Sequence, residues 1–454
     1  MPPARQHSAS QRKKVLTVVV AYALVHVSLK ALHNRRWAQR TVARISGGAL
    51  APLPPRPLRH KSSIPDHLGL VKKEEELLWL GTNENNFRIM FRFTPTETLT
   101  MARLFCLPPW LRINRSRWVS AEWTFCVFLG WMTGLREIDL GTLFNIDAAD
   151  VSRLIKYTMA HVAPVSKFLH DVRYIPNLDE YLVDRLPEIT SFVNRATGTH
   201  PEDLLVYGFV DGVVVKIAQP SRRILASLGG AKTDVDPTYT GEHCAHYLNL
   251  LATCLPDGSV VTKTQARAAS CNDHMLQPET ETFHVRRHAE SGTFHVDMLG
   301  SGPGPSNDDQ TVYQFGDKGF HESRFTTVYK PDWQVRTTDW AARFNEHFKT
   351  VRIEIEHIFR ELEINFCVLS RPHKLRVFDV DCGKVQRIID AAFVLMECKN
   401  CFRPNQVSQF SAISPLSLER RVGVAVQAAQ NGIDRAVGNV NNVEVRNGPP
   451  RRNL

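Results

Sequence analysis

Four short runs of β-branched and aromatic residues follow one another from about Leu204, and they constrain the fold more than any other feature of the sequence. They read LLVYGFV, VVVKIA, YLNLLATCL and VVTKTQA. Asp211-Gly212 and Pro256-Asp257-Gly258 punctuate them and predict hairpin turns. A further strand, TVYQFG, and a long helical stretch over 338–369 come next. This order predicts an α/β fold with a central mixed sheet covered by helices.

The rest of the chain divides around this region, because 454 residues exceed the usual size of one domain. We expect an N-terminal helix and a Pro-rich connector over residues 1–66, and an all-helical domain over 67–180. The α/β domain is expected over 181–415, with a polar insertion near 278–309. Residues 416–454 are expected to form a mostly disordered tail, because Asn, Gly and Arg are frequent after Ile433.

The apolar stretch Val15–Leu32 follows a basic Arg12-Lys13-Lys14 and resembles a signal anchor or a short transmembrane helix. His26 and Lys30 interrupt it, and its apolar residues form a helical stripe. We therefore prefer a helix packed on the body of the protein, and we do not expect the membrane to be a partner.

Composition indicates the kind of partner and compartment. The 56 Lys and Arg residues exceed the 46 Asp and Glu residues, which gives a net charge of +10 and a pI of about 9.2. Such an excess of positive charge favours a polyanionic binding partner, although a net positive charge can also serve only to keep a protein soluble. Nine scattered cysteines indicate reduced thiols in the cytosol or nucleus. The close pair Cys398 and Cys401 lacks further zinc ligands, and we interpret it as structural.

Three acidic residues are candidates for a metal site. Asp211 ends the strand YGFVDG, Asp317 follows a second strand in VYQFGDKGF, and Glu356 lies in the predicted helix VRIEIEHIF. Phosphodiester cleavage needs an activated oxygen nucleophile and a stabilised leaving oxygen, and two Mg²⁺ ions about 3.5–4 Å apart can supply both. Mg²⁺ prefers hard oxygen ligands, so a few carboxylates at one end of a sheet would suit it.

Each candidate has an alternative interpretation. Asp211-Gly212 is also an ordinary turn, and GDKG is also an ordinary loop. Glu356 shares its helix with Glu354, Glu361 and Glu363, and all four could belong to a solvated face. Spacing alone does not decide between these interpretations.

The sequence segments around these three acidic residues resemble those of Harbinger-type transposases and their DDE superfamily endonuclease relatives. GFVDGVVVKIAQPS is similar to the first catalytic block of that family, and YTGEHCAHYLNLLATCLPDG to the next one. SCNDHML, with Asn272-Asp273, stands where the family has an "HD" or "ND" pair. FGDKGF resembles the block of the second catalytic Asp, and Arg352, Glu356 and Phe359 fit the final block. The resemblance is ordered from about Tyr207 to Pro415.

The resemblance implies an RNase H-like domain that cuts DNA with Mg²⁺ or Mn²⁺, with Asp211, Asp317 and Glu356 as catalytic and metal-binding residues. It also implies that the protein is nuclear, that it acts with a Myb-like partner protein, and that it could form a homo-oligomer. The chain departs from the family at His243-Cys244, at RAASCND, which lacks a usual glycine, and at Leu395-Met396-Glu397, where relatives often read Leu-His-Asn. These departures leave open a domesticated, catalytically silent DNA-binding protein with the same fold.

A helix-turn-helix is the candidate DNA-binding element of the helical domain. A helix from about Leu135 to Phe144, a turn at Asn145-Ile146 and an N-cap at Asp147 precede a second helix. Its buried stripe is expected to be Val151, Leu154, Ile155, Met159 and Val162. That leaves Ser152, Arg153, Lys156 and Tyr157 outward, with Arg153 and Lys156 as DNA contacts. An ordinary helical hairpin would show the same pattern.

Arg352 is a third candidate for DNA contact. It lies one turn before Glu356 on the same predicted helical face. From that position it could touch a phosphate, orient the carboxylate of Glu356, or form a surface ion pair.

Overall fold

In the computed structural model the chain divides into two compact units, Met1–His67 and Leu68–Leu454. All described residues belong to the second unit: 84–114, 117–176, 182–198, 205–221, 236–240, 245–298, 309–317, 319–328, 356–372, 375, 383–438 and 444–446. The expected N-terminal helix Val15–Leu32 and the Pro-rich connector lie outside these residues. Within them, no helix is long and apolar enough to cross a membrane.

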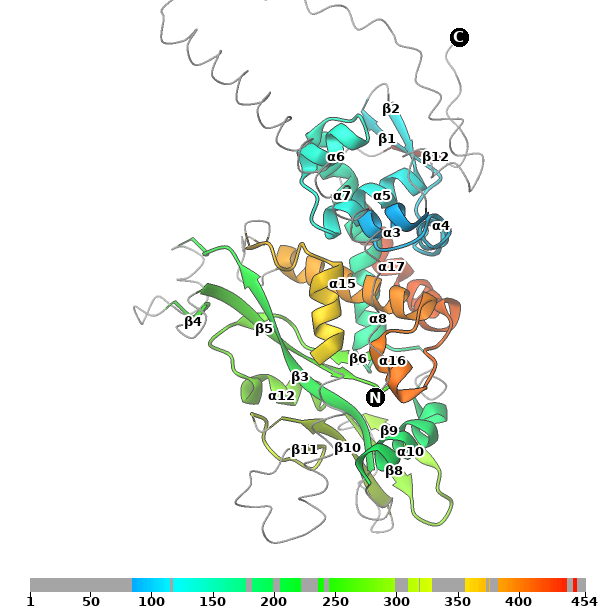
Figure 1. Cartoon of the computed structure of the whole chain (residues 1–454), viewed down its shortest axis with the longest axis vertical. Coiled ribbons are helices and arrows are strands. Elements are labelled where there is room, and N and C mark those ends of the chain that lie inside the picture. Colours follow the sequence, from blue (N-terminus) through cyan, green and yellow to red (C-terminus); the bar gives the residue numbers. More distant parts are fainter. Residues whose placement is uncertain are drawn as a thin grey trace, which may run out of the picture. The chain divides into compact units, whose positions relative to one another are not determined.

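A nine-stranded mixed sheet forms the centre of the second unit, which confirms the α/β fold class (Figure 1). Its principal strands are β3 (Leu205–Ile217), β5 (Ala245–Cys254), β6 (Val260–Lys263), β10 (Asp309–Gly316) and β11 (Thr326–Val328). β6 pairs antiparallel with β5, and β5 pairs antiparallel with β3. β10 pairs parallel with both β3 and β11, so the order across the sheet is β6-β5-β3-β10-β11. Two short strands, β4 (Tyr239–Thr240) and β7 (Arg267–Ala268), also pair with β5.

The expected hairpin turn at Asp211-Gly212 is wrong, because β3 runs through both residues as one strand. Every residue from Phe209 to Ile217 has a partner on β5, with Asp211 opposite Ala252. Gly212 does not have a positive φ, as a tight hairpin of this kind would require. The β-branched residues that follow Gly212 therefore continue the strand.

The expected turn at Pro256-Asp257-Gly258 is confirmed, since it joins β5 to β6, but it is buried rather than exposed. Gly258 has φ +81, and the side chain of Asn405 occupies the space where a Cβ would lie. Asn400 donates a hydrogen bond to the carbonyl of Asp257 at 3.1 Å. The Asp257 side chain also pairs with Arg185. The turn is thus an anchor between the sheet and the helices that cover it.

The polar segment expected to be an insertion contributes two strands to the sheet. β8 (Phe283–His288) pairs antiparallel with the first half of β10, and β9 (Phe294–Met298) pairs antiparallel with β8. Phe283, Val285 and Phe294 are buried, and they alternate with polar residues along the two strands. This period of two was visible in the sequence.

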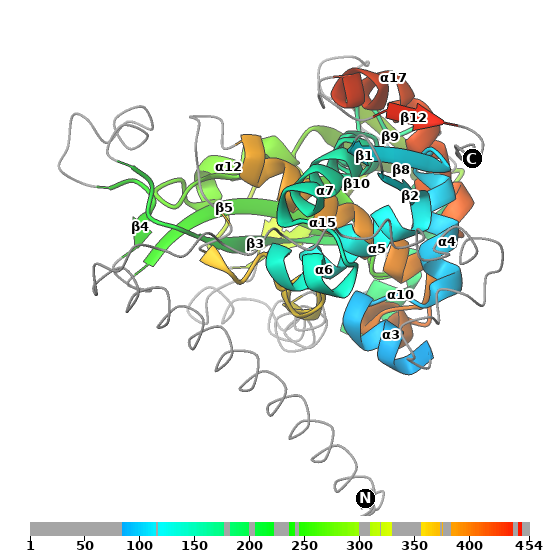
Figure 2. The same ribbon diagram turned by 90° about the horizontal axis from the view of Figure 1, so that it is seen from above.

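The described part of the expected all-helical domain contains a small sheet, which corrects that expectation. β1 (Trp110–Asn114) and β2 (Arg117–Ser120) form a hairpin, and β12 (Glu444–Arg446) pairs with β1 (Figure 2). The helices of this region are α3 (Glu84–Phe91), α4 (Pro95–Leu104), α5 (Ala121–Met132), α6 (Glu137–Leu143), α7 (Ala148–Val162) and α8 (Ser166–His170). A second stretch adds α10 (Leu186–Thr197). Short 3-10 turns precede α8 and α10, η2 (Ala163–Val165) and η3 (Val183–Arg185).

The two faces of the sheet carry different cores. Val213 and Val215 alternate onto one face and belong to a large hydrophobic cluster that includes α15 (Gly383–Phe402) and the helices before the sheet. Val210 and Leu251 form a small separate cluster with Leu276 of α12 (Asp273–Thr280). Helices α12 and α15 lie on opposite sides of the β3–β5 pair (Figure 1).

The C-terminal region is folded where the structure describes it, so the expectation of a mostly disordered tail over 416–454 is wrong there. After α16 (Gln406–Ser411) the chain forms the π-helix η6 (Glu419–Gly423) and α17 (Val424–Gly438). The guanidinium of Arg421 is buried and donates to the carbonyls of Leu169 and Val260 at 2.9 and 2.8 Å. Its Nε lies 3.3 Å from the buried carboxylate of Glu397 on α15. This pairing holds the C-terminal helices in the core.

Cys398 and Cys401 lie in the same core and carry no disulfide. Burial raises the pKa of both thiols. This agrees with a structural role, because a reactive cysteine needs an accessible thiolate.

Candidate active site

Asp211 lies on β3 just beyond the point where β10 stops pairing with that strand. The last matched pair is Phe209 with Phe315, on two parallel strands. Asp211 is partly buried, and its Oδ1 accepts a hydrogen bond from the N–H of Gly212 at 2.8 Å. By alternation it shares a face of the sheet with Val213 and Val215.

Asp317 occupies the equivalent place on the neighbouring strand. It follows the last residue of β10 and lies two residues beyond Phe315, as Asp211 lies two residues beyond Phe209. Parallel strands in register place such residues near one another. The carboxylate of Asp317 accepts a hydrogen bond from the N–H of Gly319. Both predicted residues therefore lie beside the end of β10, Asp211 inside β3 and Asp317 just after β10.

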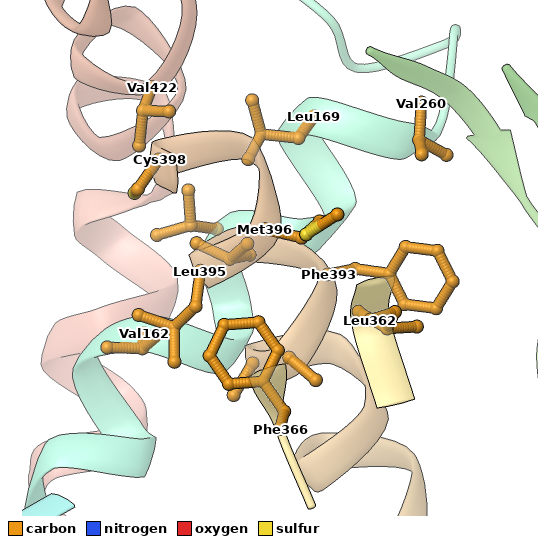
Figure 3. Packing of buried hydrophobic residues seen from close by; sticks show 14 of the residues in the cluster. Val162, Leu169, Val260, Leu362, Phe366, Phe393, Leu395, Met396, Cys398 and Val422 are labelled. Atoms are coloured by element: carbon orange, nitrogen blue, oxygen red, sulfur yellow. The ribbon is translucent and has the colours of Figure 1, made fainter. Parts of the chain in front are cut away.

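Glu356 is the first described residue of a helix over 356–365, and it is exposed. The helix buries Ile358, Phe359 and Leu362 in the large cluster that also contains Val213 and Val215. Figure 3 shows Leu362 and Phe366 in the buried cluster that also contains Phe393 and Leu395 of α15. Glu356 is thus carried by a helix whose core residues join the cluster on the Asp211 side of the sheet.

The donor chemistry of these residues suits a hard divalent cation, which prefers carboxylate oxygens. Within the described ranges, however, no group of three or more His, Cys, Asp or Glu side chains is arranged to hold a metal ion. Asp211 and Asp317 lie beside the end of β10, and together with Glu356 they do not form such a group of three.

Asp273 is a fourth carboxylate beside this sheet end, and the sequence analysis gave it no role. It is the first residue of α12, after the N-cap Asn272, whose side chain accepts from the N–H of Met275 at 3.2 Å. Burial raises the pKa of Asp273, and the negative charge of Asp317 raises it further, while His274 opposes both effects. The motif SCNDHML was the available signal, since it stands where the resembled family has an acidic pair.

α12 is tied to the loop that follows Asp317. The Gln277 side chain accepts from the backbone N–H of His321 at 2.9 Å and donates to the backbone carbonyl of the same residue at 2.8 Å. The rings of His274 and His321 stack with centroids 3.7 Å apart. These contacts fix the two acid-bearing segments, α12 and the end of β10, relative to one another.

Of the three candidate DNA contacts, the structure describes two. Arg153 on α7 donates a hydrogen bond to the carbonyl of Ile113 on β1 and lies 3.1 Å from the carboxylate of Asp150. Lys156 is exposed. Arg352 lies outside the described residues. The cation of Lys156 is available to a ligand, whereas that of Arg153 already joins α7 to β1.

The arrangement of α6, the turn and α7 differs in detail from the helix-turn-helix that the sequence predicted. Asn145 makes the turn between α6 and α7 with φ 50, and Asp147 is the N-cap residue without a side-chain capping hydrogen bond. Tyr157, expected to face outward, is only 2% exposed. α7 contacts other helices on several sides, and the Tyr157 ring packs against that of His161 with centroids 4.9 Å apart. The outward face of α7 is therefore narrower than the pattern predicted.

Comparison with known families identifies the segment around the acidic residues. Residues 210–397 match the family model described as DDE superfamily endonuclease, a segment that contains Asp211, Asp273, Asp317 and Glu356. No curated protein and no solved structure matches the chain. The family match confirms the resemblance at the level of the DDE superfamily, and it suggests that residues 210–397 form a nuclease domain.

Proposed function

We propose that this chain, whose residues 210–397 form a DDE superfamily endonuclease domain, is the DNA-cutting transposase of a Harbinger-type mobile element. The observation that carries the proposal is the register of β3 and β10. Asp211 and Asp317 each stand two residues beyond the last matched pair of these parallel strands, Phe209 with Phe315, which supports a shared site beside the end of β10. An endonuclease that uses two carboxylates on one cation site needs this kind of placement.

We further propose that the domain has an RNase H-like fold. The strand order β6-β5-β3-β10-β11 supports it, with three antiparallel strands followed by two that run parallel to β3. The connection from β6 to β10 through α12 places that helix on one face, and the helix over 356–365 packs in the cluster associated with the other.

In this mechanism Asp211, Asp317 and Glu356 would hold Mg²⁺ or Mn²⁺. Such ions would supply an activated oxygen nucleophile and stabilise the leaving oxygen. The chain supplies position: Asp211 and Asp317 are fixed by the sheet and by their bonds to Gly212 and Gly319, so their oxygens present a preset anionic site. Glu356 approaches on a helix anchored by buried apolar residues.

DNA binding is proposed for the helical region. α6 and α7 act as a helix-turn-helix, in which Lys156 contacts phosphate, and Arg153 supports α7 or reaches DNA after releasing Ile113. Arg352 is proposed to contact phosphate near the cut site. A Myb-like partner protein, a homo-oligomeric assembly and a nuclear location belong to the same proposal, since they follow from the Harbinger resemblance.

The test is cleavage of DNA that carries the terminal repeats of the element, with Mg²⁺ or Mn²⁺ present. Asp211→Asn and Asp317→Asn should each reduce the rate by at least a thousandfold, since each removes a ligand from the charge that stabilises the transition state. Asp184→Asn, an exposed acid outside the domain, is the matched control and should cut normally. Cleavage that survives both active-site substitutions would overturn the assignment.

The second candidate is a domesticated DNA-binding protein that keeps the fold without the chemistry. The departures from the family pattern, such as Glu397, favour it. It predicts salt-dependent binding of DNA and no cleavage with either metal. Finding metal-dependent cuts in the wild-type protein would exclude it.

A further inference from the structure

Arg92, in the connection between α3 and α4, has a backbone conformation that its residue type rarely adopts. Its φ is 68, in the left-handed region where glycine is usual. Its N–H donates to the carbonyl of Arg88 at 2.8 Å, the bond that closes a helix C-terminus of this type. A glycine would close α3 in the same way without backbone strain. The reason for an arginine at this position therefore lies in its side chain.

The guanidinium of Arg92 bonds to the ends of two helices that lie far apart in the sequence. Its Nη1 donates to the carbonyl of Ile89 in α3 at 3.1 Å. Its Nη2 and Nε donate at 3.3 and 3.4 Å to the carbonyls of Ile364 and Asn365, the last two residues of the helix over 356–365. The last carbonyls of a helix have no partner within it, and they carry the negative end of its dipole. One cation thus joins two helix ends that would otherwise repel each other.

Neighbouring contacts hold both sides of this junction in place. The N–H of Val368, just after the helix over 356–365, donates to the carbonyl of Met132 at the end of α5 at 3.1 Å. Nη2 of Arg403 donates to the carbonyl of Arg92 itself at 2.8 Å. Arg92 is therefore a fixed point on the helical region, and the end of the helix over 356–365 is attached to it.

Glu356 lies at the opposite end of this helix, about 14 Å from Asn365 at a rise of about 1.5 Å per residue. Arg92 therefore does not touch the proposed metal ligand, and it acts on Glu356 only through the helix. A tilt of roughly 10° about the attached end would move Glu356 by roughly 2 Å. A misplacement of about 1 Å is enough to impair a catalytic arrangement. The attachment at Arg92 thus bears on where the carboxylate of Glu356 stands.

We propose that Arg92 is a positioning residue for Glu356: it fixes the helix that carries this acid to the end of α3. The inference rests on the proposed function, because it takes Glu356 as a metal ligand. The competing explanation is that Arg92 only stabilises the fold. Its loss would then lower the free energy of unfolding and leave the metal site unchanged.

The experiment measures Mn²⁺ binding by titration calorimetry, together with urea unfolding, on the full-length protein. Arg92→Gly removes the guanidinium and leaves a residue that adopts a positive φ freely. It should weaken Mn²⁺ binding about three- to tenfold, less than the roughly 10–100-fold of a group bonded directly to a ligand. Arg92→Lys keeps a cation beside the two helix ends and should recover part of that loss. Arg88→Ala is the control, since Arg88 is exposed on α3 and bonds to Asn85 of the same helix at 3.4 Å. It should leave Mn²⁺ affinity unchanged.

The same measurement in the Glu356→Gln protein separates positioning from general stabilisation. If Arg92 acts through Glu356, Arg92→Gly should weaken Mn²⁺ binding no further once that carboxylate is gone. If Arg92→Gly lowers the affinity by the same factor with and without Glu356, or does not lower it at all, its positioning role is refuted and the proposed function stands. If Glu356→Gln binds Mn²⁺ like the wild type, Glu356 is not a ligand, and the inference fails together with that part of the proposed function.

Discussion

His161 on α7 should make the folded protein sensitive to acid. Its ring is buried, and Nδ1 lies 3.0 Å from the carbonyl oxygen of Phe105. A carbonyl only accepts, so Nδ1 carries the proton and donates it. The other ring nitrogen, Nε2, is buried with no hydrogen-bond partner among the described residues. Protonation would place a charge at that nitrogen, away from water.

The size of the effect follows from the pKa of this ring. Burial lowers the pKa of His161 from 6.5 to about 4. Because the folded pKa lies below the unfolded one, the ring contributes its full stability above pH 6.5, and that stability is lost as the pH falls toward 4. The difference corresponds to about 3 kcal/mol in all, of which roughly 2 kcal/mol is lost by pH 5.

The assay is urea unfolding of the wild type and of His161→Asn at pH 7 and pH 5. Asn keeps an N–H that can reach the Phe105 carbonyl, and it does not titrate. His170, whose pKa is also lowered by burial, titrates in both proteins, so its effect cancels in the comparison. The wild type should lose about 2 kcal/mol more than the variant between the two pH values. Equal losses in the two proteins would refute the reasoning.

Two further predictions concern charges. Glu397→Gln should destabilise the protein by about 3 kcal/mol in urea unfolding, because it leaves the buried guanidinium of Arg421 without its carboxylate. A loss below about 1 kcal/mol would show that hydrogen bonds to the backbone carbonyls are enough to stabilise the buried charge of Arg421. Lys156→Ala should weaken DNA binding and reduce the slope of log K against log salt by about 1. Arg153→Ala should mainly lower the free energy of unfolding, since Arg153 bonds to Ile113. If filter binding and urea unfolding showed the reverse pattern for the two variants, this assignment would be contradicted.

The sequence predicted the strands of the sheet better than their connections. Period-two and β-branched runs identify β3, β5, β6 and β10 because burial on a pleated surface selects those residues. Asp211-Gly212 was wrongly predicted to be a turn, because the same dipeptide occurs both in turns and inside strands. Only the pairing of β3 with β5 distinguishes the two. The strands β8 and β9 were missed because charged residues on their exposed face made the segment look like a loop.

The residues of the candidate site could also be predicted only in part, because some of their positions depend on packing between distant segments. Asp211 and Asp317 each end a hydrophobic run, and this is local information. That Asp211 lies inside β3, beside the end of β10, depends on strand pairing that no local pattern shows. The place of Asp273 beside Asp317 depends on the packing of α12 near Gly212 and Gly319, which lie far from it in sequence. Glu397 illustrates the same limit: its partner Arg421 lies in a π-helix that no local pattern indicated.

The helix that carries Glu356 gives a last prediction, because its packing can be tested without DNA or metal. Phe366, which follows the helix, is fully buried in the cluster that also contains Leu362 and Leu395 (Figure 3). Phe366→Ala should cost about 3–5 kcal/mol of unfolding free energy, since it removes a large buried ring and leaves a cavity. Ile364, 53% exposed on the same helix, is the matched control, and Ile364→Ala should change stability by less than about 0.5 kcal/mol. Similar small losses for both variants would mean that this helix is not packed on the core, and the placement of Glu356 on the Asp211 side of the sheet would lose its support.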